Sequence, residues 1–441
     1  MIKVLCPAVI LAAPASGQGK TTITAGLASM LTAQGKIVRI FKVGPDYLDP
    51  KILRQASGQP VEPLDLWMAG ETYCQDKLYQ AAQVADLILI EGAMGIFDGK
   101  PSSADLASYF GIPIAIVMDV KGMAQTAAAI ATGLANFRND FTCVGLIANN
   151  CASDRHASLI REALPESLPL LATLKRSDEV SLPERHLGLI QAEEIVEELA
   201  VSLAAGANWI AASELSNMLE RLTAVEFLPV DESKIASIPP LLAGKKIAIA
   251  KDAAFSFIYD ANLQFLTELG ATYQFFSPLT DQRLPDVDAL WLPGGYPELH
   301  AQQLMDNHAM REQIQNFAHV NKPILAECGG FLYCLHALTD LKQQEYAMCG
   351  IIPGTGIMRE RGGCQGMQTG PFPEGEIRGH SHHRSTCVDV PEAIAYGRRP
   401  FHSAPGEAIY RVSSVTASYL HLFFPSNGQA IADIFLASNE V

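Results

Sequence analysis

The sequence lacks the features that mark membrane, nucleic-acid-binding or disulfide-stabilised proteins. No apolar run approaches the ~20 residues that a membrane helix needs, and there is no internal repeat or low-complexity tract. The formal net charge is −15 and no run of Lys and Arg is present, which argues against nucleic acid as a partner. The nine Cys form no Cys-x-x-Cys pair, so we expect a reducing, cytoplasmic compartment rather than a disulfide framework or a zinc ribbon.

The composition instead fits large α/β domains. The chain has 441 residues, of which 49% are hydrophobic and 18% charged, and this length is enough for two or three domains. Residues 9–15 resemble the apolar core of a signal peptide. A phosphate-binding motif begins inside them, so we expect this segment to belong to the folded protein.

A Gly-rich segment, residues 12–22, predicts a phosphate-binding loop. It follows an apolar strand-like run, residues 9–11, and precedes apolar residues at helical spacing, residues 23–31. Strand, Gly-rich turn, Gly-Lys-Thr and helix form the arrangement that cradles phosphates. Lys20 would reach the β- and γ-phosphates and the Thr21 hydroxyl would ligate Mg²⁺. The predicted ATP contacts are Ser16, Gly17, Gly19, Lys20, Thr21, Thr22 and Asn149.

Acidic residues stand where two further apolar runs end. Asp46 and Asp49 follow residues 37–43, and open α/β sheets bind ligands at the carboxyl ends of their strands. Asp46 is placed to reach Mg²⁺ and Asp49 to face a second substrate, although a Pro-Asp turn with solvated acids explains the same pattern. Glu91 ends the run 85–90, where a buried carboxylate needs a partner. Mg²⁺ is the expected one.

Two other polar positions leave alternatives open. Asp98 lies in a Gly-rich loop, residues 92–99, that could close over a substrate or merely connect a strand to a helix. Asn149 and Asn150 end a strand-like run, where an amide can pair with the adenine edge. A capping or turn role accounts for these amides nearly as well.

The order of the elements predicts the architecture. Alternating strands and helices indicate a mostly parallel, doubly wound α/β sheet. The pattern weakens between residues 187 and 244, where amphipathic helices and several Pro residues occur. We therefore divide the chain into a P-loop domain (1–190), a linker subdomain (191–243) and a second α/β domain (244–441).

The second domain contains a candidate nucleophile. Cys328 follows an apolar run in Ala-Glu-Cys-Gly-Gly, which is typical of a nucleophile elbow with Cys in place of Ser. A following helix N-terminus would lower the thiol pKa. Backbone N–H groups at Gly295 and Gly329 could donate to an oxyanion. An inert core Cys is the alternative.

A reactive thiol needs a base, and two His-containing places stand out. We predict that His421 is the base, because it follows the nucleophile in chain order near a strand end; a buried structural His is the alternative. The loop at residues 379–385 is rich in His, but no paired carboxylate or Cys adjoins it in sequence to suggest a metal site.

Together these motifs resemble the cobyrinate a,c-diamide synthase family, glutamine-dependent amidases of corrin-ring biosynthesis, over almost the whole chain. The resemblance rests on five stretches in this order: Ser-Gly-Gln-Gly-Lys-Thr-Thr, Gly-Pro-Asp-Tyr-Leu-Asp-Pro, Glu-Gly-Ala-Met-Gly-Ile-Phe-Asp-Gly, Leu-Pro-Gly-Gly-Tyr-Pro-Glu and Ala-Glu-Cys-Gly-Gly. It implies a first domain similar to dethiobiotin synthetase and a second domain similar to triad glutamine amidotransferases.

The resemblance also implies residue roles and substrates. It makes Cys328 the thioester nucleophile and His421 its base. It implies ATP, glutamine and Mg²⁺ as reactants or cofactor, with metal contacts at Thr21, Asp46 and Glu91. The implied reaction amidates the a- and c-acetate carboxylates of cobyrinate through an acyl phosphate. The corrinoid-side residues would be Tyr47, Leu48, Asp49 and Asp98.

The chain departs from the family pattern in two places. Phe423 stands where the usual triad has a Glu after the His, and Gly-His-Ser-His-His-Arg-Ser replaces the usual Gly-His-x-Phe-His-Tyr-Ser. Alternative substrates are hydrogenobyrinate and nickel-sirohydrochlorin, and cobyric acid synthase is a related alternative. Other classes are a P-loop switch ATPase with an inactive amidotransferase domain and a carboxylate ligase that uses free ammonia. A homodimer is compatible with the sequence, and we expect no membrane or nucleic-acid partner.

Overall fold

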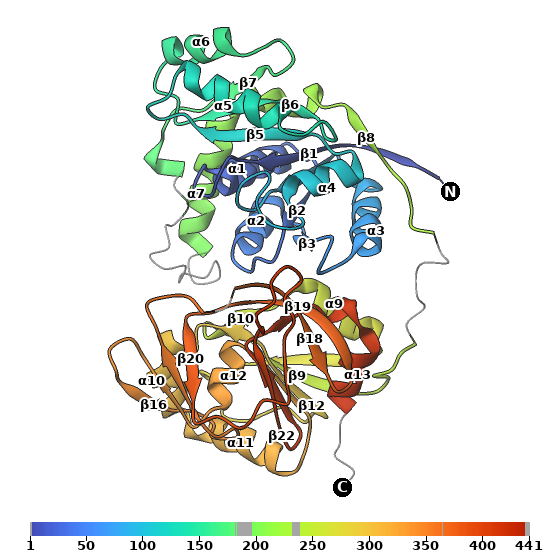
Figure 1. Ribbon diagram of the computed structural model, residues 1–441, viewed down its shortest axis with the longest axis vertical. Helices are drawn as coiled ribbons and strands as arrows, with labels where there is room; N and C mark the ends of the chain where they lie inside the picture. The colour runs from blue at the N-terminus through green and yellow to red at the C-terminus, as the bar shows by residue number, and fades with distance from the viewer. Residues whose placement is uncertain (1, 181, 183–195, 232–238, 364, 437–441) are drawn as a thin grey trace. The chain divides into compact units, whose positions relative to one another are not determined.

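The computed structural model describes residues 2–180, 182, 196–231, 239–363 and 365–436. The chain divides into two compact units, Met1–Ile235 and Ala236–Val441, drawn in blue to green and in yellow to red in Figure 1. Each unit contains its own central sheet. Among the described helices, none has the length and apolar character needed to cross a lipid bilayer.

The first unit is built on an eight-stranded sheet. Seven strands run parallel in the order β3-β2-β4-β1-β5-β6-β7, and β8 pairs antiparallel with the start of β1. The strands are β1 Val4–Ala12, β2 Val38–Val43, β3 Glu62–Leu64, β4 Leu87–Glu91, β5 Ile114–Asp119, β6 Cys143–Asn149, β7 Leu170–Thr173 and β8 Ala224–Phe227. The central strands are mostly apolar because both faces of the sheet are covered, and most of their polar residues stand near the carboxyl ends.

Helices cover both faces of this sheet. The side chains of β1 alternate between the two cores, with Ile10 in one and Leu11 in the other. The helices are α1 Lys20–Ala33, α2 Asp49–Ser57, α3 Glu71–Ala82, α4 Ser103–Phe110, α5 Gln125–Asn136, α6 Asp154–Ala163, α7 Val196–Ala211 and α8 Met218–Arg221. α1, α2 and α7 contribute to the core that contains Leu11, and α3 to α6 to the other. The predicted doubly wound α/β sheet is confirmed.

The range that we set apart as a linker subdomain, residues 191–243, behaves differently in its described part. α7 packs against α1 so closely that a Cβ on Gly26 would lie 3.0 Å from the Gly206 carbonyl oxygen. β8 adds a strand to the first sheet. Residues 196–227 therefore belong to the first unit, because their apolar side chains complete its core. The sequence did not indicate which neighbour these amphipathic helices would cover.

The second unit has a seven-stranded sheet in the order β11-β9-β12-β14-β23-β22-β21, parallel up to β23 and antiparallel beyond it. These strands are β9 Lys246–Ala250, β11 Thr272–Phe276, β12 Ala289–Leu292, β14 Ile324–Glu327, β21 Ala395–Tyr396, β22 Ala408–Val412 and β23 Val415–Ser418. Its helices are α9 Asp260–Glu268, α10 Ala301–Asp306, α11 His308–His319, α12 Gly329–Cys334 and α13 Gly428–Leu436.

Smaller sheets complete the second unit. β10 pairs with β13, β16-β15-β17-β20 form a four-stranded sheet, and β18-β19-β24 form a three-stranded one. Their bounds are β10 Phe255–Phe257, β13 Gly294–Gly295, β15 Ala337–Thr339, β16 Glu345–Ala347, β17 Thr355–Met358, β18 Gln365–Phe372, β19 Gly375–His382, β20 Ser385–Val388 and β24 His421–Leu422. The short strands β13 and β24 carry the predicted oxyanion and base residues of this unit.

Candidate active sites

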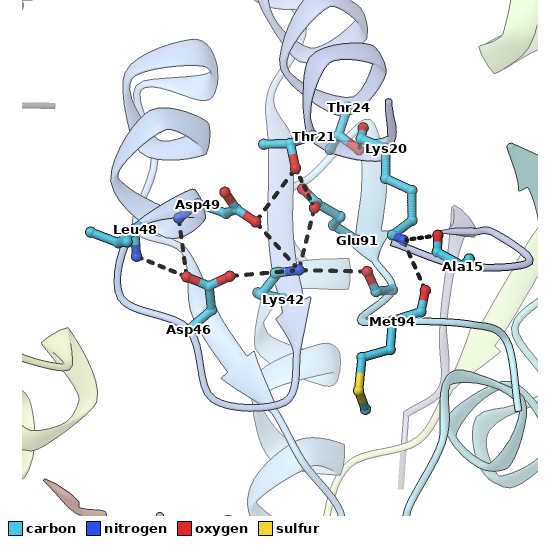
Figure 2. Close-up of polar contacts among 11 residues, drawn as sticks. Ala15, Lys20, Thr21, Thr24, Lys42, Asp46, Leu48, Asp49, Glu91 and Met94 are labelled. Atoms are coloured by element: carbon cyan, nitrogen blue, oxygen red, sulfur yellow. Dashed lines mark hydrogen bonds and ion pairs between the residues drawn. The ribbon is translucent and has the colours of Figure 1, made fainter. Parts of the chain in front are cut away.

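The predicted phosphate loop connects β1 to α1. Gly17 and Gly19 have φ of 76° and 90°, a left-handed conformation that favours glycine. Ser16 and Gly17 are exposed, whereas Lys20 is buried at the start of α1 and Thr22 lies half-buried in its first turn. The Lys20 Nζ donates to the Met94 carbonyl at 2.9 Å and the Ala15 carbonyl at 3.3 Å (Figure 2). The lysine therefore reaches across the loop toward the end of β4.

Asn149 is tied to this loop. Its Nδ2 donates to the Gln18 carbonyl at 3.0 Å, and its Oδ1 accepts from the Asn150 N–H at 2.9 Å. A Cβ on Gly19 would lie 2.3 Å from the same Nδ2. The amide thus lies against the phosphate loop and also has the turn-forming bond that we gave as an alternative.

Lys42 is the residue of this site that we missed from the sequence. It lies in β2 with a side chain that is 6% exposed, and its Nζ is 3.3 Å from Glu91 Oε1, 3.7 Å from Asp49 Oδ2 and 3.8 Å from Asp46 Oδ2. Figure 2 shows the ammonium among the three carboxylates. Burial lowers the pKa of Lys42, but the carboxylates together outweigh burial and hold the pKa above its ordinary value. A buried Lys near the end of a mostly apolar strand was the available signal.

Thr21 and Glu91 meet as the predicted metal site requires. The Thr21 Oγ1 donates to Glu91 Oε1 at 2.8 Å and lies 3.4 Å from Asp49 Oδ2. Glu91 is buried, and burial raises its pKa, opposed in part by Lys42.

The oxygen atoms of Thr21 and Glu91 fit a Mg²⁺ ion that is bound together with a nucleotide. Within the described part of the chain, the buried Glu91 Oε2 has no hydrogen-bond partner. No three His, Cys, Asp or Glu side chains of the described residues converge as a finished metal site. A nucleotide-bound Mg²⁺ needs only one or two carboxylates, because phosphate and water oxygens complete its shell.

Asp46 has the turn role that we gave as an alternative, and its second oxygen faces the candidate metal site. Its Oδ1 accepts from the Leu48 and Asp49 N–H groups at 2.8 and 3.2 Å, which forms the turn before α2, while Oδ2 faces Lys42. Burial and then the charge of Asp49 raise the pKa of Asp46 to about 7. Tyr47 and Leu48 lie half-buried in the same turn.

Asp98 shapes the loop after β4. Its Oδ2 accepts from the Gly95 N–H at 3.1 Å, and its own N–H donates to the Gly95 carbonyl at 3.0 Å. A Cβ at Gly95 would lie 2.4 Å from that carboxylate. The Asp98 side chain is exposed, and its two bonds to Gly95 organise the turn. Met94, next to this turn, accepts a hydrogen bond from the Lys20 Nζ through its carbonyl oxygen.

In the second unit Cys328 occupies a sharp turn between β14 and α12. Its φ of 46° and ψ of −102° are strained for a residue with a side chain. A Cβ on Gly330 would lie 2.0 Å from the Leu292 carbonyl oxygen, so only glycine fits there. The backbone therefore has the strand-turn-helix form of a nucleophile elbow.

The electrostatics around the thiol differ from our expectation. Burial, followed by the charges of Glu298 and Glu407, raises the pKa of Cys328 well above its ordinary value. The bond to the Gly329 N–H opposes this shift without overcoming it, because α12 is short and the surroundings are apolar. This shift favours the thiol over the thiolate.

The predicted oxyanion donors lie against each other. A Cβ on Gly329 would approach the Gly295 nitrogen to 2.9 Å, and one on Gly295 would approach the Ala254 carbonyl oxygen to 2.0 Å. The missing side chains thus let two backbone segments meet beside Cys328.

His421 lies at the same edge of the sheet. The ladder between β14 and β23 ends with the pair Glu327–Ser418, so Cys328 and His421 both follow the carboxyl ends of neighbouring strands. His421 is 1% exposed, and a Cβ on Gly294 would lie 2.3 Å from its Cε1. Burial, followed by the charge of His380, lowers the pKa of His421 well below its ordinary value, which favours the neutral imidazole.

The His-rich stretch that we expected to form a loop, residues 379–385, instead runs along β19 to His382 and enters β20 at Ser385, and its His residues have two separate neighbourhoods. His380 stacks on His421 with ring centroids 5.0 Å apart. His383 Nε2 lies 2.9 Å from Glu407 Oε1, and its ring stacks on Tyr419 at 3.8 Å. Glu407, distant in sequence, is thus an acidic neighbour that the local pattern did not reveal.

Comparisons with known proteins assign the two units to two different domain families. A CobQ/CobB/MinD/ParA nucleotide-binding domain matches residues 9–190, and a CobB/CobQ-like glutamine amidotransferase domain matches residues 246–429. The chain is 49% identical to the hydrogenobyrinate a,c-diamide synthase of Stutzerimonas stutzeri, over 97% of this chain and 98% of that relative. It is 46% identical to the Pseudomonas aeruginosa protein of the same name, over the full length of both.

A third relative is named for cobyrinate instead of hydrogenobyrinate. The cobyrinate a,c-diamide synthase of Herminiimonas arsenicoxydans is 44% identical over 97% of this chain and 96% of that relative. Identity of this level over nearly whole chains, with both domains matched in order, establishes the family. The chain belongs to the cobyrinate and hydrogenobyrinate a,c-diamide synthases, ligases that join a nucleotide-binding domain to a glutamine amidotransferase domain.

Proposed function

We propose that this chain, in the cytoplasm, uses ATP and glutamine to convert the a- and c-acetate carboxylates of a cobyrinate-type ring into amides. The observation that carries the proposal is the 44–49% identity to a,c-diamide synthases over almost their whole length. The two candidate sites supply one half-reaction each.

The second unit would release ammonia from glutamine. The Cys328 thiol, deprotonated by His421, attacks the side-chain amide and forms a tetrahedral intermediate. Backbone N–H groups of Gly295 and Gly329 would hold the oxyanion, at roughly 3 kcal/mol for each donor. His421 then gives its proton to the departing ammonia and activates the water that hydrolyses the thioester to glutamate.

The first unit would activate the acid. Transfer of the γ-phosphoryl group of ATP to a substrate carboxylate gives an acyl phosphate and ADP. Lys20 and Lys42 supply positive charge to the transferring group. The nucleotide is held by Ser16, Thr22 and Asn149, together with the backbone of the glycines in the phosphate loop. Mg²⁺, held by Thr21, Asp46 and Glu91 together with phosphate oxygens, would add Lewis-acid stabilisation of the same charge. Ammonia then displaces phosphate and leaves the amide.

Residues beside the metal site would contact the ring. Tyr47, Leu48 and Asp49 lie in the turn that Asp46 closes, and Asp98 lies in the loop that Lys20 reaches through Met94. Both segments follow the carboxyl ends of strands, where open α/β sheets bind ligands. We therefore assign them to the corrinoid substrate.

The names of the relatives favour a metal-free ring as a second candidate. The two relatives at 49% and 46% identity are named for hydrogenobyrinate, and the one at 44% for cobyrinate. Purified chain should be given ATP, Mg²⁺ and glutamine with cobyrinate, hydrogenobyrinate or nickel-sirohydrochlorin in competition, and products resolved by mass. Two successive amidations of cobyrinate or hydrogenobyrinate are expected; ATP turnover that leaves the acids of all three rings intact would refute the proposal.

A further inference from the structure

Glu327, the residue before the candidate nucleophile, connects three strand ends. It is 2% exposed. Its Oε1 accepts from the Leu422 N–H at 2.8 Å and its Oε2 accepts from the Trp291 Nε1–H at 2.9 Å. The two donors belong to β24 and β12, while Glu327 itself ends β14. One carboxylate thus holds segments that are far apart in sequence.

Each of these contacts adjoins a reacting group. Glu327 precedes Cys328, Leu422 follows His421, and Trp291 stands three residues before Gly294. β24 pairs with β19 rather than with the main sheet. The main ladder between β14 and β23 ends at Ser418, three residues before His421. The Glu327–Leu422 bond therefore joins the nucleophile strand directly to the base strand beyond the end of that ladder.

The base strand is also held from its other side. Asn262 donates to the Leu422 carbonyl at 2.8 Å and accepts from the Phe424 N–H at 2.9 Å. These bonds fix β24 to α9, whereas Glu327 fixes it to the strand that carries Cys328. Phe423, where the usual triad has its acid, is fully buried and packs edge-on to Tyr259, so this position is apolar.

We propose that Glu327 is the positioning residue of the glutaminase centre, which holds His421 in register with Cys328 through the backbone of the base strand. Each oxygen of the Glu327 side chain accepts one N–H donor, so the two bonds are made at the same time. Burial raises the pKa of Glu327 to about 8, and the bonds from Leu422 and Trp291 oppose this shift. The inference rests on the proposed glutaminase half-reaction.

The test is Glu327→Gln in the full chain. The amide has the same shape but only one acceptor oxygen, and its NH₂ group would face the second donor. We expect kcat for glutamate release to fall on the order of 10- to 100-fold, the loss that a displacement of about 1 Å produces, with KM for glutamine little changed. Amidation with ammonium salt should keep its wild-type rate, since the first unit performs it.

A matched control separates position from burial. Glu374 is a half-buried acid of the same unit, with two bonds to Arg411, and Glu374→Gln should leave glutamine hydrolysis near the wild-type rate. If Glu327→Gln does not fold, Glu327→Asp withdraws the carboxylate by one methylene and should show the same selective loss in kcat.

The outcomes distinguish the inference from the function beneath it. Wild-type glutamate release together with full activity in Glu327→Gln, or in Glu327→Asp where that is the folded variant, would overturn the inference alone. An equal loss in Glu374→Gln, or equal losses with glutamine and with ammonium, would do the same by showing a general structural effect. Absence of glutamate release by the wild-type chain would refute the proposed function and the inference with it.

Discussion

Replacement of Lys42 by Met removes the cation that stands among three carboxylates. Lys42 and Glu91 are 6% and 1% exposed, so the acids lose a partner that water cannot replace. Removal of one member of a buried pair costs about 3–5 kcal/mol. For a unit of this size, that corresponds to a fall in Tm of roughly 6–20 °C, at about 2–4 °C for each kcal/mol.

The assay is calorimetric unfolding of the full chain in EDTA and in excess Mg²⁺. Lys36→Met is the matched control, because Lys36 pairs with Asp86 at an exposed position, where both side chains are more than a third exposed. Exposed pairs contribute only about 0–1 kcal/mol. We expect the Lys42→Met deficit to be largest in EDTA and to shrink when Mg²⁺ supplies positive charge to the same oxygens.

The deficit should also depend on pH in a defined direction. The acids around Lys42 are neutralised by protons as pH falls, and Asp46 already has its pKa raised to about 7. The difference between Lys42→Met and wild type should therefore be greater at pH 8 than at pH 5. A Tm equal to that of Lys36→Met, or a deficit that Mg²⁺ leaves unchanged, would refute the assignment of Lys42 to the metal site.

Three further variants test other parts of the sites. Cys328→Ala should abolish glutamine-dependent amidation, by at least on the order of 10³-fold, and spare amidation with ammonium salt; loss of both would make Cys328 structural. Gly19→Ala places a Cβ 2.3 Å from Asn149 Nδ2 at a φ of 90°, and strain of about 1–3 kcal/mol should weaken ATP binding about 10- to 100-fold in a calorimetric titration. Asp46→Asn keeps an acceptor for the Leu48 N–H but loses the charge. Because the folded-state pKa of Asp46 is raised, its contribution to stability is complete below about pH 4 and is lost as pH rises through about 7. In urea unfolding without metal, the free energy of unfolding of the wild type should fall by about 2–4 kcal/mol more than that of Asp46→Asn as the pH rises through this range. Parallel plots of this free energy against pH would contradict the predicted ionisation.

Much of each site could be predicted because most of its residues belong to short, local sequence motifs. The Gly-Lys-Thr loop and the Ala-Glu-Cys-Gly-Gly elbow join a strand to a helix within a few residues, so local geometry follows from glycine placement. The same reasoning placed acids at strand ends, as with Glu91. The role of Lys42 was not predicted, because a cation in a strand is informative only when its partners are known. Those partners come from two other segments.

Electrostatics could not be anticipated in the same way. We expected the helix after Cys328 to lower the thiol pKa, but burial and the charges of Glu298 and Glu407 outweigh that effect. The thiol environment depends on how much water the packed chain excludes and on acids that approach from other segments. Neither quantity has a signature in the neighbouring sequence.

Residue types at fixed local spacing were enough to predict the two α/β units, the phosphate loop, the nucleophile elbow and the family. Three features became visible only in the folded chain: residues 196–227 complete the first unit, Lys42 stands among three acids, and Glu327 joins the nucleophile strand to the base strand. These features arise where strands distant in sequence end at one edge of a sheet, and the burial there sets which charges must pair.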